Sequence, residues 1–309
     1  MSKGSVVRQR TLGTTEACIS QVTFGSMRLP VNSGVEPTAR FLAELFDRGV
    51  DTHHSSMEYD TYSSYARAVH RLRSSGRRPK HIVKVAEPSF DNDRFDAKRF
   101  VSRIDDELRA LDTDVLHNVQ WLVRTADPGG DGAHDALRRA LEMMPDLSDR
   151  LVSSGKVHSI SAFPYTSAAA ALLVDSGAVN ALCAYLNLVE HLECSQLEAV
   201  PAIALRPLSG GALSSKNPHW LSTSGKATLR PIVEAMPGSP ADASLACAGW
   251  PLLHPNVATI VLSVADDNRV GPTLKALGGI EPHESAFRAM QSLSRSLPGR
   301  DSLLQMKAS

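Results

Sequence analysis

Three ionisable side chains stand at or just beyond the ends of short apolar segments. His54 closes the segment 50–54, Tyr59 follows five residues later, and Lys84 lies within the segment 82–86. A phenol has an unperturbed pKa of about 10, and a nearby ammonium makes it more acidic by stabilising the phenolate. A neutral histidine can act as a base near pH 7. Brought together by the fold, these residues could move protons to and from a small molecule.

A second group of side chains could bind that molecule. Gln120, Trp121 and Arg124 stand at the end of another apolar segment, and Arg206 directly follows a fourth one. Two guanidinium groups suit a carboxylate or a phosphate. We expect these four residues, together with Glu87 after the segment that carries the lysine, to form a substrate-binding surface.

The composition is that of a globular protein with balanced charge. The 309 residues include 33 basic and 33 acidic side chains, and 42% are hydrophobic. An even charge argues against nucleic-acid binding, which needs a basic stripe. No apolar run reaches the roughly 18 residues of a membrane helix, and the amino-terminal segment does not resemble a signal peptide. The four cysteines lack metal-ligand spacing, so we expect a cytoplasmic protein with no metal. From the charge and the short apolar runs, we expect no membrane or nucleic-acid partner.

Short apolar segments alternate with amphipathic helical stretches along the chain. Eight segments predict strands that are buried on both faces: 19–24, 50–54, 82–86, 115–123, 157–162, 182–188, 202–205 and 259–263. This alternation is typical of an α/β fold of the (β/α)8 TIM barrel type, and no GxGxxG turn supports a doubly wound sheet. Residues 10–19 predict an N-terminal β-hairpin that caps the barrel. We expect one barrel domain over residues 1–309.

Eight short motifs, in order from about residue 8 to residue 277, resemble the landmarks of the aldo-keto reductase superfamily. They are Arg10-Thr-Leu-Gly, Thr23-Phe-Gly-Ser-Met, Gly49-Val-Asp-Thr with Tyr59 ten positions on, Ile82-Val-Lys84, Leu111-Asp-Thr-Asp, Gly155-Lys-Val-His, Arg206-Pro-Leu-Ser-Gly-Gly and His254-Pro-Asn-Val. The resemblance implies a (β/α)8 barrel and, in most members, reduction of carbonyl groups with NADPH.

The catalytic tetrad that the resemblance implies is half present. Tyr59 matches the proton donor, and Lys84 matches the lysine that tunes it. The superfamily's aspartate falls on His54 and its histidine on Leu122. A histidine would not anchor the ammonium as an aspartate does, and we expect the loop carboxylate of Glu58 to be solvated. The resemblance thus implies an altered site with Tyr59, Lys84 and His54 as catalytic residues.

The positions that the resemblance assigns to the cofactor depart further. Phe163-Pro164 stands where Ser-Asn binds the nicotinamide amide, Cys183 replaces a glutamine, and Leu205 replaces a stacking aromatic residue. Asp266 and Asp267 stand where a basic residue clamps the 2′-phosphate. Four further residues would contact a nucleotide if one binds: Gly25, Ser209, Gly210 and Arg269.

Three functions are open at this point. The altered cofactor positions favour a redox-neutral enzyme without a cofactor, one that eliminates, isomerises or cyclises a small metabolite by acid/base chemistry. The first alternative is an NAD(P)H-dependent carbonyl or imine reductase with Tyr59 as proton donor. The second alternative is a non-catalytic binding or regulatory barrel. The sequence names no substrate, and it fits a monomer or a homodimer.

Overall fold

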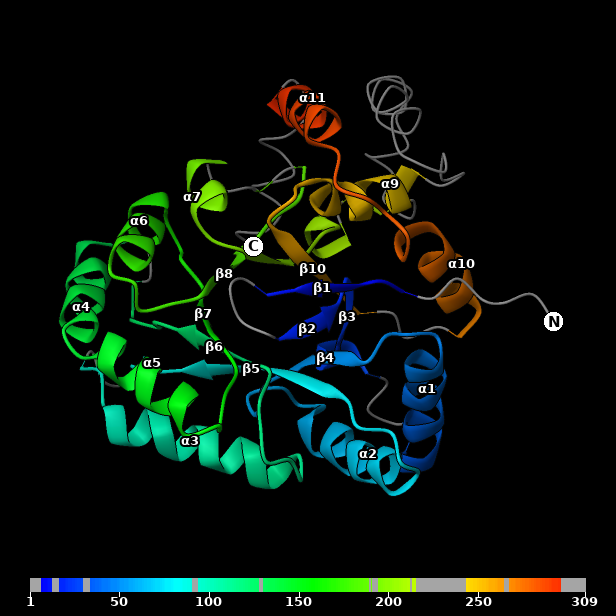
Figure 1. Cartoon of the computed structure of the whole chain (residues 1–309), viewed down its shortest axis with the longest axis horizontal. Coiled ribbons are helices and arrows are strands. Elements are labelled where there is room, and N and C mark those ends of the chain that lie inside the picture. The colour runs from blue at the N-terminus through cyan, green and yellow to red at the C-terminus, as the bar shows by residue number, and fades with distance from the viewer. Residues whose placement is uncertain are drawn as a thin grey trace.

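The fold is a closed barrel of eight parallel strands. A computed structural model describes residues 7–12, 17–29, 34–90, 94–127, 130–188, 190, 194–211, 213–214, 243–263 and 267–295. The strands follow one another around the barrel in chain order from β3 to β10, and β10 pairs with β3 to close it. Helices surround the strands (Figure 1). This is the predicted (β/α)8 barrel.

The strands and helices have the following bounds. The barrel strands are β3 (Val22–Gly25), β4 (Thr52–Ser55), β5 (Lys80–Ala86), β6 (Asn118–Leu122), β7 (Ile160–Ala162), β8 (Ala181–Tyr185), β9 (Ala202–Leu205) and β10 (Val257–Leu262). The α-helices are α1 (Val35–Asp47), α2 (Tyr62–Ser74), α3 (Ala97–Ala110), α4 (Asp131–Leu141), α5 (Met144–Ser153), α6 (Ser167–Asp175), α7 (Cys194–Ala199), α9 (Ala243–Gly249), α10 (Asp267–Leu277) and α11 (Glu284–Arg295). Short 3-10 helices are η1 (Ser26–Arg28), η3 (Ser209–Gly211) and η4 (Trp250–Leu253). Within the described residues, no helix is long and apolar enough to cross a membrane.

The predicted amino-terminal hairpin is present and lies across one end of the barrel (Figure 1). Strands β1 (Gln9–Thr11) and β2 (Cys18–Ser20) pair in antiparallel register, with Arg10 opposite Ile19. Ile19 is fully buried and packs in the cluster of apolar side chains that fills the barrel interior. The predicted strand 19–24 is therefore two strands, one in the hairpin and one in the barrel. The predicted turn at 13–16 lies outside the described residues.

Side chains alternate between the barrel interior and the helical layer along β5 and β6. Ile82 and Leu122 belong to the interior apolar cluster, whereas Val83 and Trp121 belong to the cluster beneath the helices. Because neighbouring residues of a strand point to opposite faces, Lys84 and Gln120 point into the barrel. These two residues are also register partners on adjacent strands. The strands thus place a lysine and an amide side by side in the interior.

Candidate active site

Tyr59, Lys84 and Glu58 meet at the end of the barrel to which the strands' carboxyl ends point. The Nζ atom of Lys84 lies 4.8 Å from the centre of the Tyr59 ring. The same Nζ atom lies 2.8 Å from Oε2 of Glu58. The sequence predicts the first contact, but not the second. Glu58 is exposed, as expected of a loop carboxylate, but it is also ion-paired, and it supplies the carboxylate that His54 cannot.

A short loop between β4 and α2 holds Glu58 and Tyr59 over the barrel. The hydroxyl of Ser56 donates a hydrogen bond to the backbone carbonyl of Lys84 at 3.1 Å, which ties the loop to β5. The backbone amide of Glu58 donates to this hydroxyl at 3.3 Å, and the amide of Tyr59 donates to the Ser56 carbonyl at 3.1 Å. Tyr59 is itself tied to the start of α2, because its carbonyl accepts from the amide of Tyr62 at 2.8 Å. These bonds fix where the acid and the phenol lie relative to Lys84.

The electrostatics of this trio keep the phenol protonated at neutral pH. Burial raises the pKa of Tyr59, and the Glu58 carboxylate raises it further. Burial lowers the pKa of Lys84, while its ion pair with Glu58 acts in the opposite direction. Burial alone would raise the pKa of Glu58, but Lys84 and Arg124 outweigh it and hold that pKa below its usual range. The Tyr59 phenol is therefore protonated at neutral pH and is a weaker acid than a free phenol.

His54 lies inside the barrel and is not poised as a base. Its Nε2 atom lies 2.6 Å from Oε1 of Gln120, and its ring centroid lies 6.4 Å from that of Tyr59. An amide oxygen only accepts, so Nε2 carries the hydrogen and donates it. Burial lowers the pKa of His54 to about 4, although its hydrogen bond to Gln120 acts in the opposite direction. At pH 7 this histidine is neutral and a weak base, which counters the role that the sequence suggested for it.

Arginines and aromatic rings surround the opening above Tyr59. Arg124, just after β6, places Nη1 2.6 Å from Oε1 of Glu58, and its guanidinium lies 5.1 Å from the centre of the Phe90 ring. The guanidinium of Arg206 lies 4.8 Å from the centre of the Tyr185 ring. Arg124 and Arg206 therefore lie at the opening, as expected for substrate-binding residues. The two rings were not singled out from the sequence.

Two predicted substrate-binding residues, Trp121 and Glu87, point toward the helical layer and away from the opening. Trp121 is fully buried beneath the helices, where its Nε1 donates to the backbone carbonyl of Glu87 at 2.7 Å. The Glu87 side chain is also fully buried, and Oε2 lies 3.3 Å from Nε of Arg99 on α3. Strand alternation explains both corrections, because odd positions here face the helical layer. Gln120 faces the interior as expected, where it holds His54.

The residues assigned to a nucleotide occupy mixed positions. Gly25 ends β3, where an added Cβ would lie 3.0 Å from the hydroxyl of Ser263. Ser209 is buried, and its hydroxyl donates to Glu190 at 3.3 Å. Gly210 has φ +68°, and an added Cβ would lie 2.6 Å from Nη2 of Arg206, so this position needs glycine. Arg269 is exposed in the first turn of α10.

The predicted replacements for the nicotinamide contacts are apolar in the structure. The Phe163 ring packs edge-to-face on Tyr165 and Tyr185, with centroids 5.0 and 4.9 Å away. Cys183 is buried beside the hydroxyl of Ser161, at 3.2 Å, and burial raises the pKa of its thiol to about 12. The acidic pair predicted to oppose a 2′-phosphate cannot be placed: residue 266 and the side chain of residue 267 lie outside what the structure describes.

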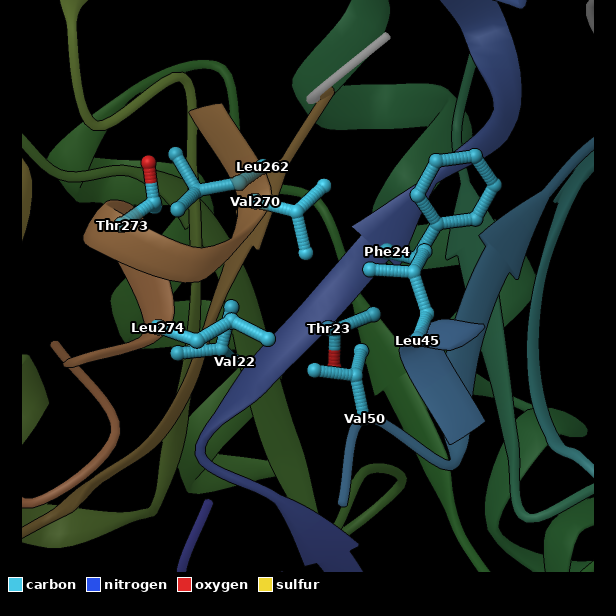
Figure 2. Close-up of a pocket in the computed structure, with 9 residues that line it drawn as sticks. All are labelled: Val22, Thr23, Phe24, Leu45, Val50, Leu262, Val270, Thr273 and Leu274. Carbon is cyan, nitrogen blue, oxygen red and sulfur yellow. The ribbon is translucent and has the colours of Figure 1, made fainter. Parts of the chain in front are cut away.

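A separate pocket lies between the barrel and two helices (Figure 2). Strands β3 and β10 and helices α1 and α10 line it with side chains such as Val22, Leu45, Val270 and Leu274. It contains no acid or base, so it is a packing feature of the outer layer. The cluster of ionisable side chains lies instead around Tyr59 at the end of the barrel.

Comparison with known proteins connects this geometry to one fold. The sequence matches no family model, and comparison with curated proteins finds no match. Among solved structures, the aldo-keto reductase AKR11C1 from Bacillus halodurans aligns with a TM-score of 0.69 and 16% identity, over 93% of this chain and 96% of that chain. An aldo/keto reductase from Klebsiella pneumoniae, solved in complex with NADP and acetate, aligns with a TM-score of 0.65 and 17% identity, over 95% and 96%.

A third solved structure gives the same result. The thermostable aldo-keto reductase Tm1743, in complex with the inhibitor epalrestat, aligns with a TM-score of 0.66 and 19% identity, over 93% of this chain and 99% of that chain. Each alignment covers nearly the whole barrel. The chain therefore has the fold of the aldo-keto reductases, as its motifs suggested.

Proposed function

We propose that this protein is a carbonyl-reducing enzyme of the aldo-keto reductase type, with Tyr59 as the proton donor. The observation that supports it most directly is the Glu58–Lys84–Tyr59 cluster, in which one carboxylate and one ammonium lie beside a protonated phenol. Reduction of a carbonyl group builds negative charge on its oxygen, and a positioned phenol can neutralise that charge by proton transfer. The solved structures that share the fold are aldo-keto reductases, which supports the same reaction.

The residues at the opening fit a nicotinamide nucleotide, although not through its amide. Phe163 offers no hydrogen bond to an amide, and its buried ring packs edge-to-face on Tyr185, whose own ring lies against the Arg206 guanidinium. Arg206 and Arg269 would meet phosphates with their guanidinium groups. When bound, the nucleotide supplies a hydride to the carbonyl carbon; one solved neighbour is a complex with NADP. Without the amide hydrogen bonds we expect binding to be weaker by a factor of about 10.

Each residue of the cluster then has a distinct task. The Tyr59 hydroxyl hydrogen-bonds the carbonyl oxygen and donates its proton as negative charge grows there. The Lys84 ammonium stabilises the phenolate that is left behind. Glu58 keeps that ammonium charged and in place, despite the burial that disfavours its charge. His54 and Gln120 form the floor of the site, and their hydrogen bond fixes the orientation of the imidazole.

A redox-neutral reaction is the second candidate. The specific observation in its favour is the Phe163 ring, which stands where the superfamily holds the nicotinamide amide. It requires a base as well as an acid, however, and His54 with a pKa of about 4 is poorly suited to that task at neutral pH. We therefore rank reduction first, which reverses the order drawn from the sequence alone.

Nucleotide binding and turnover test the proposal together. Purified protein is titrated with NADPH and with NADH, following nucleotide fluorescence, and then assayed by loss of absorbance of the reduced nucleotide with a panel of aldehydes and ketones. We expect binding of at least one nucleotide and turnover that Tyr59→Phe lowers by about 10²- to 10⁴-fold without weakening nucleotide binding. If neither nucleotide binds, reduction is excluded and the redox-neutral candidate takes its place.

A further inference from the structure

Large apolar side chains collect around the opening above Tyr59. Of the seven large hydrophobic residues exposed within the described chain, two are remote, Met143 and Val152. The other five follow barrel strands at the carboxyl end or close one of them: Met27, Met57, Phe90, Tyr165 and Tyr185. Exposed apolar side chains concentrated in one place indicate a binding surface rather than chance exposure. This surface suits a ligand with an apolar or aromatic body.

Arg124 brings a positive charge into that apolar surface. Its guanidinium lies 5.1 Å from the centre of the Phe90 ring and hydrogen-bonds the Tyr165 side chain, and the N–H groups not used by Tyr165 or Glu58 remain for a ligand. Glu58 contacts Nη1, one of the three nitrogens that carry the five donors of a guanidinium. Burial raises the pKa of both Tyr59 and Tyr165; the Arg124 charge opposes this at Tyr59, and its hydrogen bond and charge oppose it at Tyr165. Arg124 thus lies within electrostatic reach of the reacting phenol.

The charges around Glu58 are not balanced. One carboxylate contacts two cations, with Lys84 Nζ at 2.8 Å from one oxygen and Arg124 Nη1 at 2.6 Å from the other. This trio therefore carries one net positive charge. Lys84 has 14% of its side chain exposed and Arg124 has 21%, so their charges are only partly screened by water. A ligand with one negative charge would complete the balance.

We infer that the substrate is a carbonyl compound that carries a carboxylate on an apolar or aromatic body, and that Arg124 binds this carboxylate. The inference rests on the proposed reduction and names its substrate class. The carbonyl oxygen meets the Tyr59 hydroxyl, the carboxylate meets the N–H edge of Arg124, and the body lies among the exposed rings. Arg124 is then the residue that determines specificity. A planar guanidinium matches a planar carboxylate with two parallel hydrogen bonds.

A matched set of aldehydes tests this assignment. The probes are 4-carboxybenzaldehyde, its methyl ester and 4-formylphenyl phosphate, which keep the reacting group and vary the charge. We expect the wild-type protein to show kcat/KM about tenfold or more higher for the acid than for the ester. Arg124→Gln should reduce this ratio to about one, mainly through KM for the acid. The ratio is the readout, because losing Arg124 also changes the surroundings of Glu58 for every substrate.

Two further variants locate the carboxylate. Arg124→Lys keeps the charge without the planar fork and should give an intermediate ratio. Arg206→Gln removes the other guanidinium of the opening and should leave the ratio above about fivefold. The assignment is overturned if the wild-type ratio is one or less, if Arg124→Gln preserves it, if Arg206→Gln abolishes it instead, or if the phosphate is preferred to the acid.

A binding measurement separates this inference from the proposed reaction. Calorimetric titration with 4-(hydroxymethyl)benzoate and with its methyl ester needs no turnover. If the wild-type protein binds the acid more tightly and Arg124→Gln removes the difference, carboxylate recognition stands even if no aldehyde is reduced. If aldehydes are reduced but neither ratio depends on Arg124, the reaction stands and the substrate class is wrong.

Discussion

The Nζ atom of Lys84 lies 2.8 Å from Oε2 of Glu58, a residue of the loop that also carries Tyr59. In the superfamily that the motifs resemble, the corresponding carboxylate comes from the position of His54, on strand β4. Here the carboxylate has moved four residues along the chain, from the strand to the loop. The ammonium therefore keeps a counter-ion although the expected position has lost it. This replacement makes a working proton donor consistent with an altered tetrad.

Replacing Glu58 with glutamine should move the alkaline limb of the pH profile. Glu58 raises the pKa of Tyr59 and opposes the burial that lowers the pKa of Lys84. Removing its charge lowers both values, so kcat/KM should begin to fall at a lower pH than in the wild-type protein. We expect the midpoint of the alkaline limb to move down by about one pH unit, measured as kcat/KM against pH.

The conservative variant Glu58→Asp is the control for this change. It keeps the charge and should retain an alkaline limb closer to that of the wild-type protein, with a reduced rate because the shorter side chain reaches Lys84 less well. Ultraviolet difference spectra of tyrosine ionisation give a second readout that is independent of turnover. A profile that is the same in Glu58→Gln and wild type would show that the ion pair plays no part in tuning.

Buried histidines should make the protein acid-sensitive. Burial lowers the pKa of His53 to about 4 from its usual value of 6.5. The unfolded chain therefore binds more protons than the folded chain between these values, so stability is lost as pH falls from 6.5 towards 4. At pH 5 the loss from this one residue is about 2 kcal/mol. His53→Asn should weaken the pH dependence of the unfolding free energy by that amount, measured by urea denaturation at pH 5 and pH 7.

Glu107 should make the protein less stable as the pH rises, which is opposite to the effect of His53. It lies on the buried face of α3, where its carboxyl group accepts a hydrogen bond from the Tyr62 hydroxyl, and burial raises its pKa to about 7. The folded state binds this proton more tightly than the unfolded state does, so the contribution to stability is full below pH 4.5 and is lost as pH rises through 7. The unfolding free energy of Glu107→Gln, relative to that of the wild-type protein, should rise by about 2 kcal/mol from pH 5 to pH 8. If Glu107→Gln changes the unfolding free energy by the same amount at pH 5 and at pH 8, the folded state does not raise the pKa of Glu107.

Arg10 should contribute to stability without affecting the site. Its guanidinium donates to the backbone carbonyls of Leu252, Val257 and Ile280, with the shortest bond at 2.7 Å, and to the side chain of Gln21. Arg10→Met leaves three carbonyls without this donor, and we expect a loss of about 2–4 kcal/mol in urea unfolding. Substrate KM should stay within about twofold of the wild-type value. A tenfold shift in KM would show instead that the hairpin that carries Arg10 affects the candidate site at the other end of the barrel.

The sequence predicted the framework better than the site. Alternation of apolar segments and helices is a property of each stretch of chain, so the eight strands and the hairpin were accessible without tertiary information. Tyr59 and Lys84 were found because motifs place them at strand ends. Trp121 was misplaced because neighbouring residues of a strand face opposite sides, so Trp121 faces the helical layer while Gln120 faces the interior.

Glu58 and the aromatic rings were missed for a different reason. A loop carboxylate is usually solvated, and only the spatial neighbours Lys84 and Arg124 distinguish this one. The signal in the sequence was its position directly before Tyr59. Tyr185 and Phe90 carry no local pattern, because their role arises from arginines that come from distant segments.

Because Glu58 lies in a loop, the site consists of two parts: cations held by the barrel, and an acid and a phenol held by the loop. Lys84 belongs to β5 and Arg124 follows β6, while Glu58 and Tyr59 are consecutive residues of the segment that Ser56 ties to the barrel. The proton donor and its counter-charge therefore move together, and any outward movement of this segment breaks both ion pairs at once. The proposed proton transfer therefore depends on the position of one loop, whereas a carboxylate on a strand would be held by the barrel itself.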